Sequence, residues 1–200
     1  MAKTTDVQVT DNASAQLSQD LLARMAAGDR RSLSALVDLH GRGLRIFCAR
    51  SLRVAHEAED VVQDTFLAAW THAARYDPAR GAVATWLYRI ALNLCLSRNR
   101  RATVRRFLGL DWDDTVAQPP SDRADATRSL AARQRLAQVR AEIAALPARQ
   151  RHALLLRVVA DLEVPAIAEV MGTGSGAVEQ LLVRARAKLR SGAGAELDWE

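Results

Sequence analysis

The sequence predicts an all-α protein of two small helical domains joined by a flexible acidic linker, the second containing a helix-turn-helix. Aromatic residues make up only 4% of the 200 residues while Ala and Leu recur throughout, a composition that favours helices over a β-sandwich or barrel. Apolar residues recur at helical spacing on both sides of an acidic, proline-bearing stretch around Pro119 and Pro120. This break divides the helices into two groups.

The first group of helices follows a polar lead. Residues 1–16 show no apolar periodicity, and we expect them to be disordered. From Leu17 a helix places apolar residues on one face, and it ends at Gly28 and Asp29. Further helices are expected over about residues 32–52, 57–74 and 85–106, with a turn over residues 76–81. The first domain therefore spans residues 17–106.

The second group follows the linker, which we place over residues 107–127. The second domain spans residues 128–190, and a short tail over residues 191–200 is expected to fray. Pro147 and Pro165 each stand where a helix can start, because proline fits the first helical turn. Glycines between residues 172 and 176 separate the last two helices.

Composition and charge exclude several classes of protein. No apolar run reaches the roughly 18 residues of a membrane span, and the N-terminus lacks the apolar core of a signal peptide, so we expect a cytoplasmic protein. Cys48, Cys95 and the four histidines lack the spacing of a disulfide framework or metal site, so we expect neither metal nor cofactor. No catalytic constellation stands out, which argues against an enzyme. The formal charge of +5 indicates a polyanionic partner only weakly.

The helix over residues 57–74 carries an acidic face. On a helical wheel its apolar side forms a core face, which comprises Ala58, Val61, Val62, Thr65 and Ala69. The opposite face, which we call the acidic face, comprises Asp60, Gln63, Asp64 and Leu67. An apolar leucine among acids indicates a surface that a partner covers; the alternative is a solvated face with one stray leucine.

The helix over residues 85–106 is apolar around most of its circumference, but one narrow stripe is polar. The stripe, which we call the melting stripe, comprises Trp86, Arg89, Asn93, Ser97 and Arg100. Aromatic, amide and guanidinium groups stack on bases, bond base edges and neutralise phosphates. Six arginines and no acid lie between residues 89 and 106, which indicates nucleic-acid binding. The alternative is the solvated face of a buried helix.

The last two helices predict a helix-turn-helix over residues 165–190, although an ordinary αα-hairpin has the same pattern. Ser175 is available as the N-cap of the second helix. Its outward side, with flanking arginines, suits the major groove, where Gln180 can pair with adenine and Glu179 with cytosine. The glycine-rich segment over residues 172–176 follows no strand and lacks the lysine of a phosphate-binding loop.

These segments resemble the extracytoplasmic-function (ECF) subfamily of sigma-70 family bacterial sigma factors, in the right order and over residues 17–190. Residues 59–70 (EDVVQDTFLAAW) resemble its polymerase-binding helix, and residues 85–93 (TWLYRIALN) its promoter-melting helix. Residues 146–151 (LPARQR) resemble the start of the second conserved domain. Its helix-turn-helix is matched at residues 167–169, 171–172, 176–178 and 184–186.

The resemblance implies a sigma region 2-like domain over residues 17–106 and a region 4-like domain over residues 128–190. The first would dock on a coiled coil of the largest subunit of core RNA polymerase through the acidic face, and would capture and flip bases of the −10 promoter element. The −10 residues implied are Tyr76, Arg80, Trp86, Arg89, Asn93, Ser97, Arg100 and Arg101. The −35 residues implied are Arg151, Ser175, Glu179, Gln180, Val183, Arg184 and Arg186. A cognate anti-sigma factor, often membrane-bound in this family, would hold the protein inactive.

The chain departs from the family pattern in the recognition helix. Ala177 stands where threonine is usual, and Glu179, Gln180 and Leu181 follow where Lys, Ser or Thr, and Arg are frequent, so no −35 sequence carries over. Ser97 stands where aspartate is frequent. The Glu179 helix and residues 107–109 resemble sigma factors of heavy-metal resistance. The alternative function is a stand-alone helix-turn-helix regulator, which would bind an operator without polymerase but leaves the acidic face unexplained.

Overall fold

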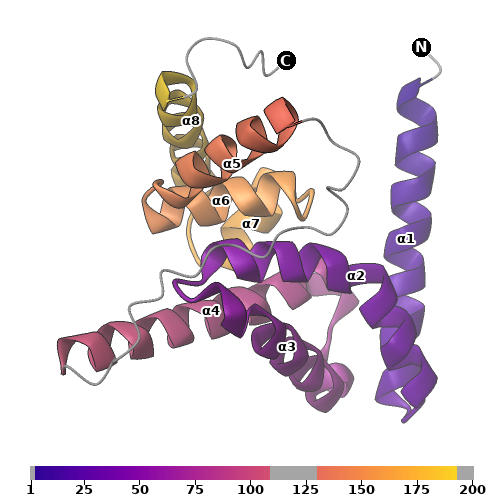
Figure 1. Ribbon diagram of the computed structural model, residues 1–200. Helices are drawn as coiled ribbons and strands as arrows, with labels where there is room; N and C mark the ends of the chain where they lie inside the picture. The colour runs from indigo at the N-terminus through magenta and orange to yellow at the C-terminus, as the bar shows by residue number, and fades with distance from the viewer. Residues whose placement is uncertain (1–2, 109–129, 193–200) are drawn as a thin grey trace.

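The computed structural model describes residues 3–108 and 130–192, and within these ranges it is helical without a strand. Figure 1 shows the long helices, which are α1 (Lys3–Ala26), α2 (Arg30–Ser51), α3 (Ala58–His72), α4 (Val83–Phe107), α5 (Leu130–Ala144), α6 (Ala148–Val158), α7 (Val164–Met171) and α8 (Ser175–Gly192). Short 3-10 turns cover Ala55–Glu57, Ala73–Arg75 and Pro78–Arg80. The all-α prediction is confirmed.

Helix α1 differs from the expectation at its start. It begins at Lys3 rather than Leu17, so residues 3–16 are helical and not the expected disordered lead. Leu21, Leu22 and Met25 are buried against the other helices, whereas Leu17 is half exposed. In Figure 1 the N-terminal half of α1 stands away from the remaining helices. The turns that pack through Leu21, Leu22 and Met25 nucleate the helix. Extending it towards the N-terminus then costs little free energy, because each added residue gains a hydrogen bond.

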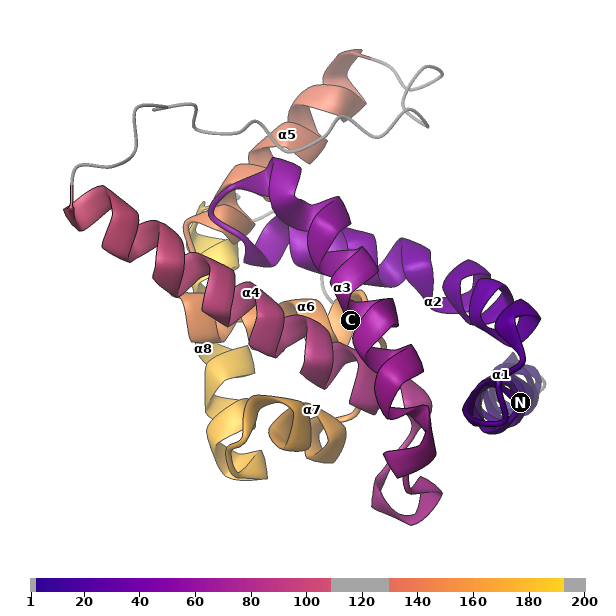
Figure 2. The ribbon, with the colours of Figure 1, turned by 90° about the horizontal axis from the view of Figure 1, so that it is seen from below.

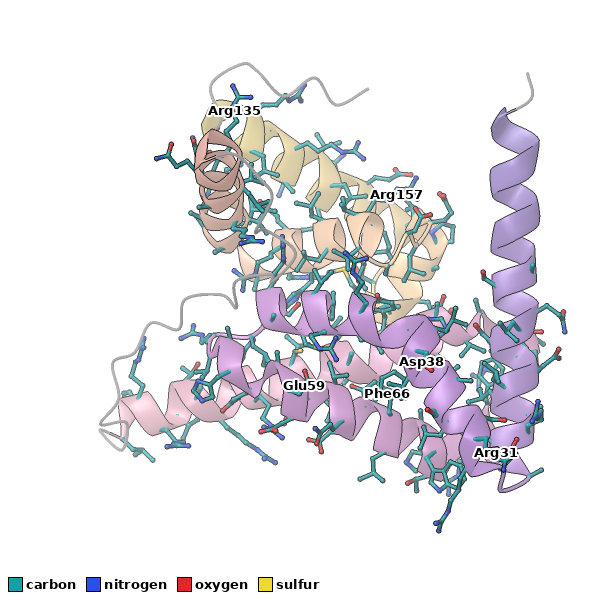
Figure 3. All side chains as sticks on the ribbon, turned by 45° about the vertical axis from the view of Figure 1, so that its right-hand side comes forward. Arg31, Asp38, Glu59, Phe66, Arg135 and Arg157 are labelled. Atoms are coloured by element: carbon teal, nitrogen blue, oxygen red, sulfur yellow. The ribbon has the colours of Figure 1, made fainter. Side chains whose placement is uncertain are left out.

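Helices α2, α3 and α4 pack into the core of the first half. The predicted core face of α3 is buried, and Phe66 lies between α2 and α3 (Figure 3). Asp29 caps α2 by accepting a hydrogen bond from the Arg31 amide. A glycine in the middle of a helix usually weakens it, but Gly43 does not interrupt α2. Its missing Cβ makes room for α4, since a Cβ there would lie 2.5 Å from the Tyr88 hydroxyl.

The second half contains the predicted helix-turn-helix. Pro165 lies in the first turn of α7, and Gly172 ends α7 in the left-handed conformation, at φ +59°. Helix α8 begins at Ser175, and the carbonyl of Gly174 accepts from the amide of Val178. Ser175 is thus the first helical residue rather than the N-cap. Likewise Pro147 precedes α6 as its N-cap residue instead of lying inside the first turn.

The two halves pack against each other through α4 with α7 and α2 with α6 (Figure 2). Buried apolar residues from both halves form one continuous cluster, which joins Phe47 and Leu87 to Leu156 and Ile167. The rings of Phe47 and His152 lie 6.5 Å apart across this contact. Of the expected linker, Phe107 and Leu108 belong to the end of α4 or cap it, and residues 109–127 lie outside the described ranges.

Candidate nucleic-acid and partner interfaces

The acidic face of α3 lies on the outside of the first half, opposite the core face. Asp60, Gln63 and Leu67 are exposed, and Leu67 exposes 64% of its surface. Asp64 is half-buried, and its carboxylate accepts a hydrogen bond of 2.8 Å from Arg98 of α4. Three of the four predicted residues are therefore open to a partner, while the fourth also ties α3 to α4.

The melting stripe follows one side of α4. Asn93 and Arg100 are exposed, whereas Trp86, Arg89 and Ser97 are partly covered. Leu96, on the apolar part of the circumference, exposes 42% of its surface. Figure 2 shows α4 extending beyond the other helices at its C-terminal end, so that no neighbouring helix covers this part of it.

The loop before α4 places Tyr76 beside the stripe. The Tyr76 ring lies 5.5 Å from the Trp86 ring, and its hydroxyl donates to the Gly81 carbonyl at 2.8 Å. Burial raises the pKa of Tyr76, which keeps the hydroxyl protonated as that donor. Two partly covered aromatic rings next to an exposed asparagine can stack on and bond an unpaired base. Arg80 is exposed on the same loop.

The arginine run divides between surface and structural roles. Arg100 and Arg101 are exposed, so they can neutralise phosphates. Arg98 instead bonds Asp64, and the neighbouring Asn99 accepts from the Arg53 amide at 2.8 Å and donates to the Ser51 carbonyl at 2.9 Å. The charge run in the sequence did not distinguish these roles, because they depend on which side of α4 faces α2 and α3.

A carboxylate from the second half reaches the melting stripe. Glu169 of α7 accepts a hydrogen bond of 3.1 Å from Nη1 of Arg89. No pattern in the sequence indicates this contact, since the two residues are 80 positions apart. By contrast, the ion pair of Arg45 with Glu59, at 2.8 Å, joins α2 to α3 within the first half. Glu59 is labelled on α3 in Figure 3.

The outward side of α8 is open to solvent. We call it the recognition face, and its exposed residues are Ser175, Glu179, Gln180, Val183, Arg184 and Arg186. On the opposite side, a helical wheel predicts that Val178, Leu181, Leu182, Ala185 and Leu189 face inward; all are buried except Leu181, which is partly buried. The N-terminal turns of α8 present an amide, a carboxylate and an apolar side chain, and arginines follow them along the helix, a set suited to base edges and phosphates.

Arg151 does not join this face. Its Nη1 donates to the carbonyls of Ala144 and Leu146, at 2.8 and 3.4 Å, and so holds the end of α5. Burial and the nearby Arg53 lower its pKa. The guanidinium of Arg151 is thus partly buried at the end of α5, and its assignment to −35 recognition stays a prediction.

The buried titratable groups are structural. Cys48 and Cys95 are both buried, and a hydrogen bond with Cys95 together with burial raises the pKa of Cys48, so its thiol stays protonated. No group of three or more His, Cys, Asp and Glu side chains in the described ranges can hold a metal ion. No described helix combines the length and hydropathy that a membrane span requires.

The described helices carry one acidic face on α3 and two arginine-bearing surfaces on α4 and α8, and comparisons with known proteins give the family of the chain. Residues 36–105 match the family described as Sigma-70 region 2, and residues 136–189 match Sigma-70, region 4. The RNA polymerase sigma factor NccH of Alcaligenes xylosoxydans xylosoxydans is 35% identical over 86% of this chain and 92% of its own. CnrH of Cupriavidus metallidurans is 36% identical over 84% and 90%, and the ECF sigma factor SigM of Mycobacterium tuberculosis is 33% identical over 85% and 81%.

A solved structure of CnrH in complex with the cytosolic domain of CnrY aligns with a TM-score of 0.64 at 32% identity, covering 88% of this chain and 96% of that one. The sigma factor RpoE of Bartonella quintana, solved with the anti-sigma factor NepR, shares the fold with a TM-score of 0.66 at 24% identity, over 79% and 94%. The chain belongs to the sigma-70 family of RNA polymerase sigma factors, in its ECF subfamily.

Proposed function

We propose that this sigma factor docks on the coiled coil of the largest polymerase subunit through the acidic face. It opens and reads the −10 element with the melting stripe and the Tyr76 loop, and it reads the −35 element with the recognition face. It adds no catalytic group of its own, and it works in the cytoplasm, where core polymerase transcribes.

One observation carries this proposal: three separate surfaces differ in chemistry as three different partners require. The acidic face combines carboxylates with the exposed Leu67, which suits a protein partner with basic and apolar groups. The melting stripe and the recognition face instead carry guanidiniums with amide groups, which suit nucleic acid. A stand-alone regulator has no use for the first surface.

We also propose that a cognate anti-sigma factor controls the protein. The support is the 32% identical CnrH, whose solved structure is a complex with the cytosolic domain of CnrY. Because that structure and this chain align over most of both lengths, the helices that CnrH presents to its partner have counterparts here. The partner protein itself is to be identified by co-purification from the source cells.

Transcription with purified core polymerase tests the main proposal. We expect promoter-specific transcripts from genomic templates only when this protein is added. Leu67→Asp should abolish binding to core polymerase, since it puts a carboxylate into the apolar contact. Arg89→Ala with Asn93→Ala should spare core binding but prevent opening of the promoter, measured by permanganate reactivity of unpaired thymines. Equal loss of core binding in both variants would refute this division of labour.

A matched control separates docking from general effects of a surface charge. Val158 exposes 62% of its surface on α6, close to the 64% of Leu67, but lies in the other half of the chain. Val158→Asp should therefore leave core binding through the acidic face unchanged. If it weakened binding as much as Leu67→Asp, the acidic face would not be the docking surface.

A further inference from the structure

We infer that Glu169 is an intramolecular competitor of promoter DNA: in this closed arrangement its carboxylate takes the place of a DNA phosphate on Arg89 of the −10 site. This inference rests on the proposed role of the melting stripe. It adds a regulatory contact within the chain itself, between the first helix of the helix-turn-helix and the promoter-melting helix.

Both oxygens of the Glu169 carboxylate meet the proposed −10 site. Oε1 accepts from Arg89 at 3.1 Å. Oε2 lies over Gly81, where an added Cβ would approach it to 3.1 Å. The carbonyl of the same Gly81 accepts the Tyr76 hydroxyl, and Tyr76 packs beside Trp86. The carboxylate therefore lies against the loop and the arginine that would receive the DNA strand, and an anion already bound there excludes a phosphate.

Packing between the two halves delivers Glu169 to this position. His152 of α6 lies against Phe47 of α2, with 6.5 Å between the two ring centroids. The Val159 carbonyl lies 3.8 Å from the position of a Cβ on Gly43. These contacts lie within the continuous buried cluster of both halves. Because this interface holds Glu169 beside Arg89, the effective concentration of its carboxylate at Arg89 is higher than that of a carboxylic acid free in solution.

The second nucleic-acid surface is not covered in the same arrangement. Glu179, Gln180 and Val183 on the recognition face are exposed, whereas the α7 helix just before it contacts α4. The closed protein therefore engages Arg89 of its −10 site while leaving its −35 site accessible. A non-specific association of the two halves would not leave one DNA-binding surface exposed while the other is contacted.

Binding of a single-stranded oligonucleotide to the full chain tests the inference. The probe is fluorescein-labelled (dT)12, followed by anisotropy at low salt. Glu169→Gln should bind it about two- to fivefold more tightly than the unaltered protein, the range expected when one partly exposed ion pair no longer competes. Glu163→Gln is the matched control, because Glu163 precedes the same helix but pairs with Arg157 at 2.7 Å within its own half. It should bind like the unaltered protein.

A second variant opens the interface without touching Glu169. His152→Asp places a carboxylate in the buried contact with Phe47, yet that position becomes solvent-exposed once the halves separate. We expect a larger radius of gyration by small-angle X-ray scattering and tighter (dT)12 binding. A larger radius together with unchanged binding would overturn the inference, because Arg89 would then have lost Glu169 without gaining affinity for DNA.

The outcomes separate this inference from the proposed function. If Glu169→Gln and Glu163→Gln bind (dT)12 equally, while Arg89→Gln weakens binding in both backgrounds, Glu169 does not compete and the melting stripe remains the DNA site. If Arg89→Gln leaves binding unchanged even in the Glu169→Gln background, the proposed stripe itself is wrong. Tighter binding by Glu169→Gln that Arg89→Gln reverses supports both.

Discussion

Two asparagines six residues apart on α4 should have opposite consequences when replaced by alanine. Asn93 is exposed on the melting stripe. Asn99 is partly buried and uses both ends of its amide, accepting from the Arg53 amide and donating to the Ser51 carbonyl at the end of α2. The two substitutions remove the same atoms from the same helix, so they isolate what each amide contacts.

The structure sets the size of the stability difference. Asn99→Ala removes two hydrogen bonds of 2.8 and 2.9 Å that tie α4 to the end of α2. At roughly 1 kcal/mol each, their loss should lower the free energy of unfolding by about 2 kcal/mol and the melting temperature by about 4–8 °C. Asn93→Ala breaks no hydrogen bond that we find in the described residues and should change stability by less than about 0.5 kcal/mol.

Urea denaturation and promoter opening measure the two effects separately. We expect Asn99→Ala to unfold at lower urea while still opening a promoter at 20 °C, and Asn93→Ala to unfold like the unaltered protein but open it poorly. If Asn99→Ala proved as stable as Asn93→Ala, the hydrogen bonds across α2 and α4 would not contribute as argued. If Asn93→Ala opened the promoter normally, Asn93 would not be part of the DNA surface.

Three other predictions concern separate parts of the chain. Burial lowers the pKa of His152 to about 4. The free energy of unfolding should therefore keep its full value above pH 6.5, the ordinary pKa of histidine, and should fall by up to about 3 kcal/mol as the pH drops towards 4. His152→Gln should flatten this part of the pH profile of stability, measured by urea unfolding. Arg184→Ala should weaken −35 duplex binding for every sequence and reduce the slope of log affinity against log salt by about 1. Gln180→Ala should instead relax the preference at one base pair, by about 1–3 kcal/mol in a competition assay over all four bases. A single-position effect from Arg184→Ala, or a uniform one from Gln180→Ala, would reverse their assignments.

The sequence predicted those parts of the site that one helix determines alone. The acidic face and the recognition face follow from amphipathic periodicity, because the core takes one side of each helix and leaves the other outside. The start of α1 was missed for the same reason: residues 3–16 have no apolar stripe, and their helix follows from extension of the packed turns.

Contacts between distant elements could not be predicted in this way. Asn99, Arg100 and Arg101 are neighbours in an arginine-rich run, yet only the packing of α4 on α2 turns Asn99 inward. Arg151 belongs to a family motif, but its guanidinium is used at the end of α5. Glu169 lies outside both predicted DNA sets and meets Arg89 only because the two halves pack together.

The geometry of a promoter requires this closed arrangement to open. If the −10 and −35 elements lie about 25 base pairs apart, their separation along B-form DNA is about 85 Å. Helix α4, with 25 residues, is about 37 Å long, and α7 packs directly on it, so the closed protein cannot place both surfaces on both elements.

The chain is long enough for the opening. The 22 peptide steps from Leu108 to Leu130 can span at most about 70–80 Å, and each helical half adds its own width. Because both elements are reached only after α7 leaves α4, the contact between Glu169 and Arg89 must break before or during promoter binding. Any partner that holds α7 on α4 would therefore inhibit −10 recognition without touching a DNA-binding residue.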